Sequence, residues 1–288
     1  MSLNRREALA AALSALAAGA ARAAIPPVYE VQGGQYPSFD GAQLFYRRMG
    51  AGPPVVLLHS FLSDGPRSWF STGVAQALAQ AGFMVVAPDA RAHGLSAAPP
   101  GPYPKDVMAM DVEALFRFLG LRSYRLFGYA MGSGTAIRLM ARGARPERCI
   151  LGGAGVDAAT DVERLVTENT EAIRTGRTSR DPRLGVLVQA AIRLQKLNPQ
   201  ALIADLNSQV STPATELARV RAPILVLDGE HDNVEGSPYA LAGLFRDAAV
   251  FLTRGDHMTA LREPRYAAVA AAFLKSRAQP SNFVPPTA

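Results

Sequence analysis

The 288-residue sequence has little cysteine and histidine, and this scarcity excludes several kinds of functional site. A single cysteine cannot form a disulfide within the chain. The four histidines make no Cys/His cluster, and no glycine-rich phosphate-binding loop is present. We therefore expect no metal, nucleotide or flavin cofactor. Cys149 begins the apolar run CILGGAG, which predicts a buried strand residue rather than a reactive thiol.

The sequence also lacks a concentrated charge of one sign. Its 30 Lys and Arg outnumber its 24 Asp and Glu, which gives a formal net charge of +6. The arginines are scattered along the chain, and no motif for binding RNA or DNA accompanies them. We expect a mildly basic, solvated surface and no nucleic-acid partner.

No apolar run is long enough to span a bilayer, and the first residues have another pattern. Residues 1–23 contain the pair Arg5 and Arg6, then an Ala-rich stretch, then the small-residue site ARA at 21–23. The apolar stretch is about 14 residues, too short for a membrane-spanning helix. The order predicts a cleaved export signal of the twin-arginine type, a periplasmic or secreted protein, and no stable membrane anchor. The alternative is an amphipathic helix of the mature fold.

The remaining chain alternates short apolar runs with amphipathic segments of helical length. This alternation predicts an α/β fold, a mostly parallel sheet of about eight strands with helices on both faces. The expected strands are residues 42–48, 54–60, 82–89, 123–129, 148–155, 222–230 and 248–255. The expected helices lie near residues 68–81, 105–119, 131–143, 238–246 and 262–276.

The alternation stops between residues 156 and 213, where no run has the character of a strand. Short helices are predicted there instead. A helical insertion between two strands of such a sheet is typically a cap over the carboxyl edge, where ligands bind. We therefore expect a core formed by residues 24–155 and 214–288, and a helical cap formed by residues 156–213.

The stretch LFGYAMGSG, residues 126–134, predicts a strand that ends in a sharp turn and opens a helix. It fits the G-x-S-x-G elbow that presents a nucleophilic serine above a sheet, except that position 130 is alanine. Gly128 and Gly132 are in place for the close approach of strand and helix. The Ala130 methyl group cannot attack a substrate.

A histidine and a carboxylate that could serve such an elbow are found further along the chain. Of the four histidines, His257 directly follows the last expected strand, at the carboxyl edge of the sheet. A carboxylate would fix its tautomer and stabilise its charged form. Asp232, in LDGEHD just beyond the preceding strand, is the first candidate. Asp157 is its main competitor, and Asp228 and Asp256 are the others.

In its order of elbow, acid and histidine, and in the sequences of five motifs, the chain resembles the α/β-hydrolase fold superfamily. The resemblance runs from about residue 42 to residue 276. The five motifs, in chain order, are VVLLHSFLSDG, APDARAHGLSA, LFGYAMGSG, LVLDGEHD and GDHMTAL. Ser60 departs from the family pattern by standing where a glycine usually follows the histidine, and Ala130 departs from it in place of the nucleophile.

The resemblance implies roles for several residues. The backbone N–H groups of Phe61 and Met131 would form the oxyanion hole. We also assign Ser60 and Tyr129 to substrate binding, although Tyr129, beside the elbow, could instead simply pack. Asp232 and His257 would complete the catalytic set with position 130. We do not expect Ser60 or Ser133 to replace the missing nucleophile. The resemblance also implies structural roles for three residues of the turn after the third expected strand, which are Asp89, Arg91 and His93.

Three functions are compatible with these residues. The first is a serine hydrolase acting on a small-molecule carboxylic ester or lactone, present here as an inactive serine-to-alanine variant at position 130. The second is a His–Asp dyad enzyme, a lyase or cofactor-free oxygenase, that needs no nucleophile. The third is a non-catalytic protein that binds a ligand in the cap pocket. Aspartate-nucleophile hydrolases are excluded, because Ala130 cannot serve them.

Overall fold

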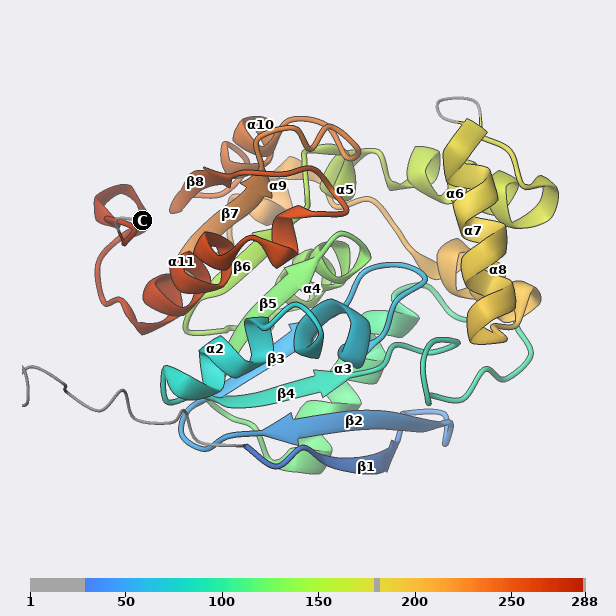
Figure 1. The fold of residues 1–288 in the computed structure, drawn as a ribbon, viewed down its shortest axis with the longest axis horizontal. Helices are drawn as coiled ribbons and strands as arrows, with labels where there is room; N and C mark the ends of the chain where they lie inside the picture. Colours follow the sequence, from blue (N-terminus) through green and yellow to red (C-terminus); the bar gives the residue numbers. More distant parts are fainter. Residues whose placement is uncertain (1–28, 179–181, 287–288) are drawn as a thin grey trace, which may run out of the picture.

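The computed structural model describes residues 29–178 and 182–286. The predicted export signal, residues 1–23, lies outside this described part. Eight strands form one sheet in the order β1-β2-β4-β3-β5-β6-β7-β8 (Figure 1). The strands are β1 Gln32–Pro37, β2 Gln43–Met49, β3 Pro54–Leu58, β4 Met84–Pro88, β5 Arg125–Tyr129, β6 Cys149–Gly152, β7 Ile224–Gly229 and β8 Ala248–Thr253.

The six strands from β4 to β8 in the sheet are parallel to one another, and only β2 runs in the opposite direction, antiparallel to both of its neighbours, β1 and β4. The predicted mostly parallel eight-stranded sheet is confirmed. Strands β3 to β7 are buried along almost their whole length, as their continuous apolar sequences require. Cys149 is fully buried at the start of β6, and burial raises the pKa of its thiol.

Strand β1 is absent from the sequence-based prediction. Its sequence QGGQYP has two glycines, a terminal proline and no alternation of apolar and polar residues. Such a segment is tolerated at a sheet edge, where it pairs on one side only. Its single buried anchor is Tyr36, whose ring packs edge-on against Tyr46 of β2.

Helices cover both faces of the sheet, because successive strand residues point to opposite sides. Val55 and Phe127 pack with α2 (Val74–Gln80) and α11 (Pro264–Lys275). Val56 and Leu126 pack on the other face with α3 (Val107–Leu119) and α4 (Met131–Ala141). Shorter elements complete the core: a π-helical turn Pro66–Phe70, α9 Ala214–Leu217, α10 Pro238–Ala242, and the 3₁₀ turns Ala260–Arg262 and Pro280–Asn282.

The described part of the segment predicted as a cap consists of helices joined by short connections and contains no strand. It contains α5 Asp157–Thr160, α6 Val162–Thr175, α7 Pro182–Gln195 and α8 Pro199–Ser208. Helices α6, α7 and α8 stand at the side of the sheet toward which β3, β4 and β5 point (Figure 1). They share a small apolar core of their own that includes Ile173, Val188 and Leu202. We call residues 156–213 the cap.

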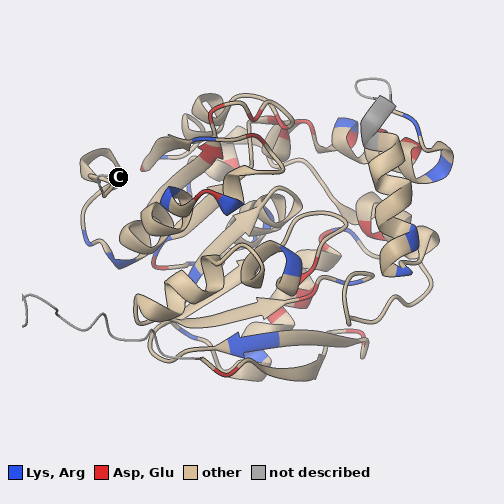
Figure 2. Ribbon diagram, viewed as in Figure 1, with Lys and Arg blue, Asp and Glu red and all other residues tan. Residues whose placement is uncertain are grey.

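Charged residues of both signs alternate over the ribbon, in the core as well as in the cap (Figure 2). The basic residues are therefore interspersed with acidic ones and do not form a separate basic segment in the described part of the chain. Within residues 29–178 and 182–286, no helix combines the length and apolar character needed to cross a bilayer.

One carboxyl group of the cap is buried without compensation. Asp205 on α8 is fully buried, and neither of its carboxyl oxygens has a hydrogen-bond partner among the described residues. Burial, together with the nearby carboxylate of Asp111, raises its pKa well above the ordinary value. The folded protein therefore holds the proton of Asp205 more tightly than the unfolded chain does.

This burial predicts a stabilising substitution. Below the pKa that Asp205 has in the unfolded chain, its carboxyl group is protonated in both states and the pH does not change stability. As the pH rises above that value, the unfolded chain releases the proton, and the free energy of unfolding falls. At pH 8, Asp205→Asn should increase the free energy of unfolding by about 2 kcal/mol, because the amide stays uncharged whereas the buried carboxyl group must either hold its proton or bear an unpaired charge. Urea unfolding at pH 8 and pH 4 measures the gain, which should shrink at the lower pH. Glu171→Gln, at an exposed position of α6, is the matched control. An equal gain at both pH values would contradict the prediction.

Candidate active site

The turn between β5 and α4 holds residue 130 in a strained conformation. Ala130 has φ 50° and ψ −117°, a backbone region that residues other than glycine rarely occupy. A Cβ atom at Gly132 would lie 1.9 Å from the Leu58 carbonyl oxygen, so only glycine fits there. The Ala130 N–H donates to the Gly152 carbonyl at 2.9 Å. The chain thus keeps the elbow geometry although the side chain carries no nucleophile.

Two backbone N–H groups near residue 130 remain available. Met131 is the first residue of α4, so its N–H has no partner within the helix and lies at the positive end of the helix dipole. Phe61 follows β3 in the loop that the resemblance assigns to the oxyanion hole. Neither N–H donates to another group in the described part of the chain. The oxyanion-hole assignment of Phe61 and Met131 stays a prediction.

His59 shapes the loop that carries Phe61. Its Nε2 accepts a hydrogen bond from the Ala90 N–H at 2.8 Å, so the ring proton is on Nδ1. Nδ1 donates to the Ser60 carbonyl at 2.8 Å. Burial lowers the pKa of His59, which keeps the ring neutral in this bridge. His59 therefore ties this loop to the turn after β4, even though Ser60 stands where the resembling family has a glycine.

Asp232 and His257 are hydrogen-bonded to each other. Asp232 lies just beyond β7 and His257 just beyond β8, and these strands are adjacent and parallel. The His257 Nδ1–H donates to Asp232 Oδ2 at 2.8 Å. The predicted contact is confirmed, whereas the catalytic roles of both residues stay predictions. Because the carboxylate occupies Nδ1, Nε2 is left with the lone pair that a general base uses.

The charge of Asp232 governs the basicity of His257. Burial alone would lower the pKa of His257, but the hydrogen bond and the negative charge of Asp232 outweigh it, so that the pKa is raised. The pKa of Asp232 is lowered, because the imidazole and the neighbouring Asp228 carboxyl outweigh the effect of burial. Asp232 thus remains ionised and ready to stabilise an imidazolium.

The competing carboxylates have other partners. Asp157 forms an ion pair with Arg164 of α6, away from the imidazole. Asp256 accepts hydrogen bonds from Thr259 in a local turn. Asp228 accepts the Gly229 N–H at 2.8 Å, and burial beside Asp232 raises its pKa. None of the three hydrogen-bonds the His257 ring in the described structure.

Tyr129 is packed in the core beside the elbow. Its side chain is buried on the face covered by α2 and α11. Its hydroxyl donates to the His257 carbonyl at 2.8 Å, and the two rings lie 5.7 Å apart. Of the two alternatives that the sequence leaves open, the structure favours packing, and the residue holds the histidine loop in place.

Ser133 and Ser60 are the two serines near the elbow that we did not expect to act as nucleophiles. Ser133 is fully buried, and its hydroxyl donates to the Gly152 carbonyl at 2.8 Å, which removes it from the site. Ser60 is half-buried, and its carbonyl accepts from the Ser63 N–H at 3.2 Å as well as from His59. The predicted contact of Ser60 with substrate stays a prediction.

The turn after β4 is a buried structural network. The Arg91 guanidinium is paired with both Asp111 and Asp40. Asp89 accepts backbone N–H groups of the two adjoining loops, and the His93 Nδ1–H donates to the Arg91 carbonyl. The side chains of Asp89, Arg91, His93 and Asp111 are buried, whereas Asp40 is more exposed. Their arrangement fits the structural role that the sequence predicts.

One positioning contact between cap and core could not be read from the sequence. Gln195, at the end of α7, donates from Nε2 to the Leu62 carbonyl at 2.8 Å. Leu62 has φ 55°, so the cap secures a strained residue directly after Phe61. The two partners are separated by 133 positions in the chain. No local pattern signals such a contact.

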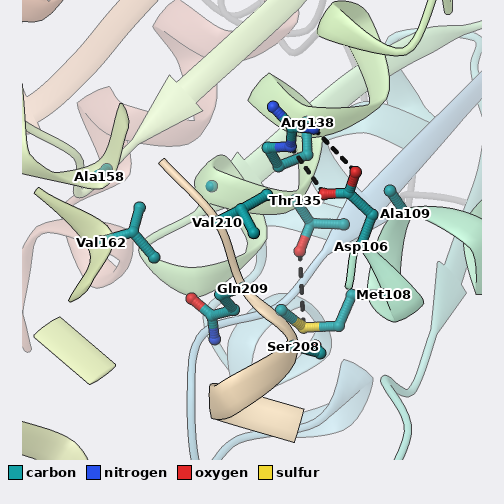
Figure 3. A pocket seen from close by; sticks show the side chains of 11 residues that line it. Asp106, Met108, Ala109, Thr135, Arg138, Ala158, Val162, Ser208, Gln209 and Val210 are labelled. Carbon is teal, nitrogen blue, oxygen red and sulfur yellow. Dashed lines mark hydrogen bonds and ion pairs between the residues drawn. The ribbon is translucent and has the colours of Figure 1, made fainter. Parts of the chain in front are cut away.

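A small cavity lies beneath the cap but away from the dyad. It is formed where the start of α3, α4 and residues 208–210 meet, and Figure 3 shows Arg138 paired with Asp106 at its wall. Its volume of about 20 Å³ admits roughly one water molecule. Arg138 also donates to Thr212 at 3.1 Å. The cavity therefore marks the junction of cap and core and is too small for a substrate.

Comparisons with known proteins agree with this geometry. A family profile described as alpha/beta hydrolase fold matches residues 53–151. A putative non-heme chloroperoxidase from Synechocystis is 34% identical over 99 residues, which are 34% of this chain and 35% of that protein. The matched stretches span less than half the length of such curated relatives.

Solved structures extend the similarity over most of the chain. An esterase from Exiguobacterium antarcticum has a TM-score of 0.69 at 18% identity, over 85% of this chain and 100% of that one. The enol-lactonase from Burkholderia xenovorans has a TM-score of 0.68 at 24% identity, over 84% and 100%. The chain has the α/β-hydrolase fold.

Proposed function

We propose that this fold is that of a serine hydrolase for carboxylic esters or lactones, and that position 130 is its nucleophile position. The observation that carries the proposal is the strained elbow at Ala130 in a chain that also hydrogen-bonds His257 to Asp232. Such strain costs about 1–3 kcal/mol, and structures keep it where function requires it. With alanine at position 130, the chain itself is expected to bind substrate without cleaving it.

The proposed chemistry requires a hydroxyl on residue 130. The hydroxyl oxygen attacks the ester carbonyl carbon while His257 Nε2 takes its proton. The carbonyl oxygen becomes an oxyanion that the N–H groups of Phe61 and Met131 stabilise. His257 then donates the proton to the departing alkoxide, which leaves an acyl-enzyme. In the second half, His257 takes a proton from a water molecule whose oxygen attacks the acyl carbon. The bond between the acyl carbon and the oxygen of residue 130 then breaks, that oxygen takes the proton from His257, and the carboxylic acid is released.

The two loops that carry the dyad also carry exposed apolar side chains. Met258, next to His257, is 71% exposed, and Val234, whose N–H donates to Asp232, is 41% exposed. A charged group of a substrate would find no ion-pair or hydrogen-bond partner among such apolar side chains. We therefore propose that the substrate is uncharged near the scissile bond. The names of the similar esterase and enol-lactonase support this class of reaction.

The experiment that tests the proposed function is ester hydrolysis by the Ala130→Ser variant. p-Nitrophenyl acetate and butyrate are suitable substrates, because both are short and uncharged. The unsubstituted chain is the matched control, since it differs by a single oxygen atom. Turnover by the variant alone supports the proposal. If Ala130→Ser and the unsubstituted chain are both folded and both hydrolyse the esters only at the background rate, the proposal is refuted.

We also propose that residues 1–23 direct export and are removed. The expected mature chain begins at Ala24, directly after the small-residue site at 21–23. Mass spectrometry of the protein from its native host should show that N-terminus. A variant with Arg5→Lys and Arg6→Lys should retain residues 1–23, because the twin-arginine route requires the arginine pair. An intact N-terminus on the unsubstituted native protein would contradict the proposal.

A further inference from the structure

The turn that carries Phe61 has a conformation that its sequence does not favour. The Ser63 N–H donates to the Ser60 carbonyl at 3.2 Å, which closes a four-residue turn with Phe61 and Leu62 at its centre. Leu62 has φ 55°, and turns with a positive φ at the third position usually have glycine there. Leucine is strained in this left-handed conformation, because its Cβ atom approaches the following carbonyl oxygen. Contacts from outside the turn must therefore stabilise it.

The core holds the turn at its two ends. His59 donates to the Ser60 carbonyl at 2.8 Å and accepts the Ala90 N–H, as described above. At the other end, the hydroxyl oxygens of Ser63 and Ser68 lie 2.8 Å apart. Neither of these contacts involves the carbonyl of Leu62, the strained residue itself.

The cap holds the middle of the turn. Gln195 donates from Nε2 to the Leu62 carbonyl at 2.8 Å. The side chains of Phe61 and Leu62 pack against the apolar core of the cap. Phe61 also packs against the cluster that contains Met131, the other residue assigned to the oxyanion hole. The two proposed oxyanion donors therefore belong to residues that meet where the cap contacts the core.

The end of α7 fixes the position of Gln195. The Leu197 N–H donates to the Ile192 carbonyl at 3.0 Å. The Lys196 N–H donates to the Arg193 carbonyl at 3.3 Å. These two bonds, with φ 54° at Lys196, form a Schellman motif. Ile192 and Leu197, the pair that such a motif brings together, both lie in the apolar core of the cap. Gln195 therefore extends from a fixed helix end.

The amide of Gln195 is only half satisfied. Its Oε1 atom is buried without a hydrogen-bond partner in the described part of the chain. A buried acceptor without a partner costs free energy, and an apolar side chain of similar size would avoid that cost. Stability alone therefore favours an apolar residue at this position, and the donor to Leu62 is what glutamine adds.

We propose that Gln195 is a positioning residue of the oxyanion hole, through which the docked cap holds Leu62 and so aligns the N–H group of the preceding Phe61. The hole is then complete only while α7 is docked on the core. The catalytic consequence rests on the proposed hydrolase function. The effect on the turn does not, because the contact is present in the chain with Ala130.

The first test follows the turn in the full chain with Ala130 and requires no turnover. Gln195→Met removes the donor and keeps the volume. Exchange of the Ser63 amide proton, measured by NMR, should become about tenfold faster, the scale of one lost hydrogen bond. Gln189→Met is the matched control, because the Gln189 amide lies on the same helix but donates to the Ala172 carbonyl of α6 at 3.1 Å, within the cap. It should leave the exchange of Ser63 unchanged.

A second substitution separates the donor from the shape of the side chain. In Gln195→Glu, the carboxylate has nearly the same volume but offers only acceptors to the Leu62 carbonyl, so exchange should be at least as fast as in Gln195→Met. If either variant is folded by circular dichroism and Ser63 exchanges at the rate of the unsubstituted chain, the proposal is overturned. An equal acceleration in Gln189→Met would also overturn it, because the effect would then belong to the cap as a whole.

The second test adds Ala130→Ser and measures hydrolysis of p-nitrophenyl butyrate. Loss of an oxyanion donor costs about 10²–10³ in kcat, so misalignment of one donor in Gln195→Met should lower kcat by about tenfold or more. KM should change little, and Gln189→Met should leave both constants unchanged. If Ala130→Ser is inactive, the proposed hydrolase function fails, while the exchange of Ser63 still decides whether Gln195 holds the turn. An unchanged kcat for Gln195→Met in an active Ala130→Ser protein would contradict the positioning role.

Discussion

Replacing Ala130 with serine is expected to turn the chain into an esterase, with kcat rising on the order of a millionfold above the Ala130 form. The added atom is one oxygen on a backbone that already has the φ and ψ of the elbow. It would meet a base whose tautomer Asp232 fixes at 2.8 Å and backbone donors that have no other partner in the described structure. Initial rates on p-nitrophenyl butyrate measure the gain.

Ala130→Gly is the matched control for this gain. Glycine relaxes the strain at φ 50° without supplying a hydroxyl, so it should stabilise the turn and leave the rate at background. Ala130→Ser combined with His257→Ala should also remain near background. A folded Ala130→Ser protein without turnover would instead favour a protein that binds a ligand without chemistry.

The second large effect is expected at Asp232. In the Ala130→Ser background, Asp232→Asn should lower kcat by about 10⁴-fold, the cost of the wrong histidine tautomer in a serine triad. The asparagine amide donates where the carboxylate accepted, so the proton moves from Nδ1 to Nε2 and the base loses its lone pair. Michaelis–Menten kinetics should show this loss mainly in kcat.

Asp157→Asn provides the control for that prediction. Asp157 is paired with Arg164 in a partly exposed contact, and losing such a pair should change kcat less than about tenfold. Asp157 also follows β6, the alternative origin of the acid. A 10⁴-fold loss in Asp157→Asn with little change in Asp232→Asn would reverse the assignment of the acid.

The dyad contact could be predicted from the sequence, because it depends on where strands end. Asp232 and His257 each follow an apolar run, and parallel strands bring their carboxyl ends to one edge. The elbow was predictable for a similar reason, since Gly128 and Gly132 are needed for a close approach within a few residues. Local chemistry and chain order sufficed for these features.

Other features depend on contacts that no local pattern records. Strand β1 has few strand-forming residues and is stabilised by its pairing with β2. The sequence left Tyr129, beside the elbow, between substrate binding and packing, and the alternation of the strand turned its ring into the core. The contact of Gln195 with Leu62 arises only when distant segments dock. A sequence shows the residue types there, but not which groups meet.

The most direct test of the central claim, that position 130 is the nucleophile site of an otherwise complete hydrolase, is covalent labelling with a fluorophosphonate. Peptide mass spectrometry locates the label in Ala130→Ser, in the unsubstituted chain, and in the double variant Ala130→Ser with His257→Ala. We expect one label, at residue 130 of the single variant, and none or only traces in the other two proteins. A folded single variant that remains unlabelled, or that carries its label on Ser60 or Ser133, would show that position 130 is not the nucleophile site.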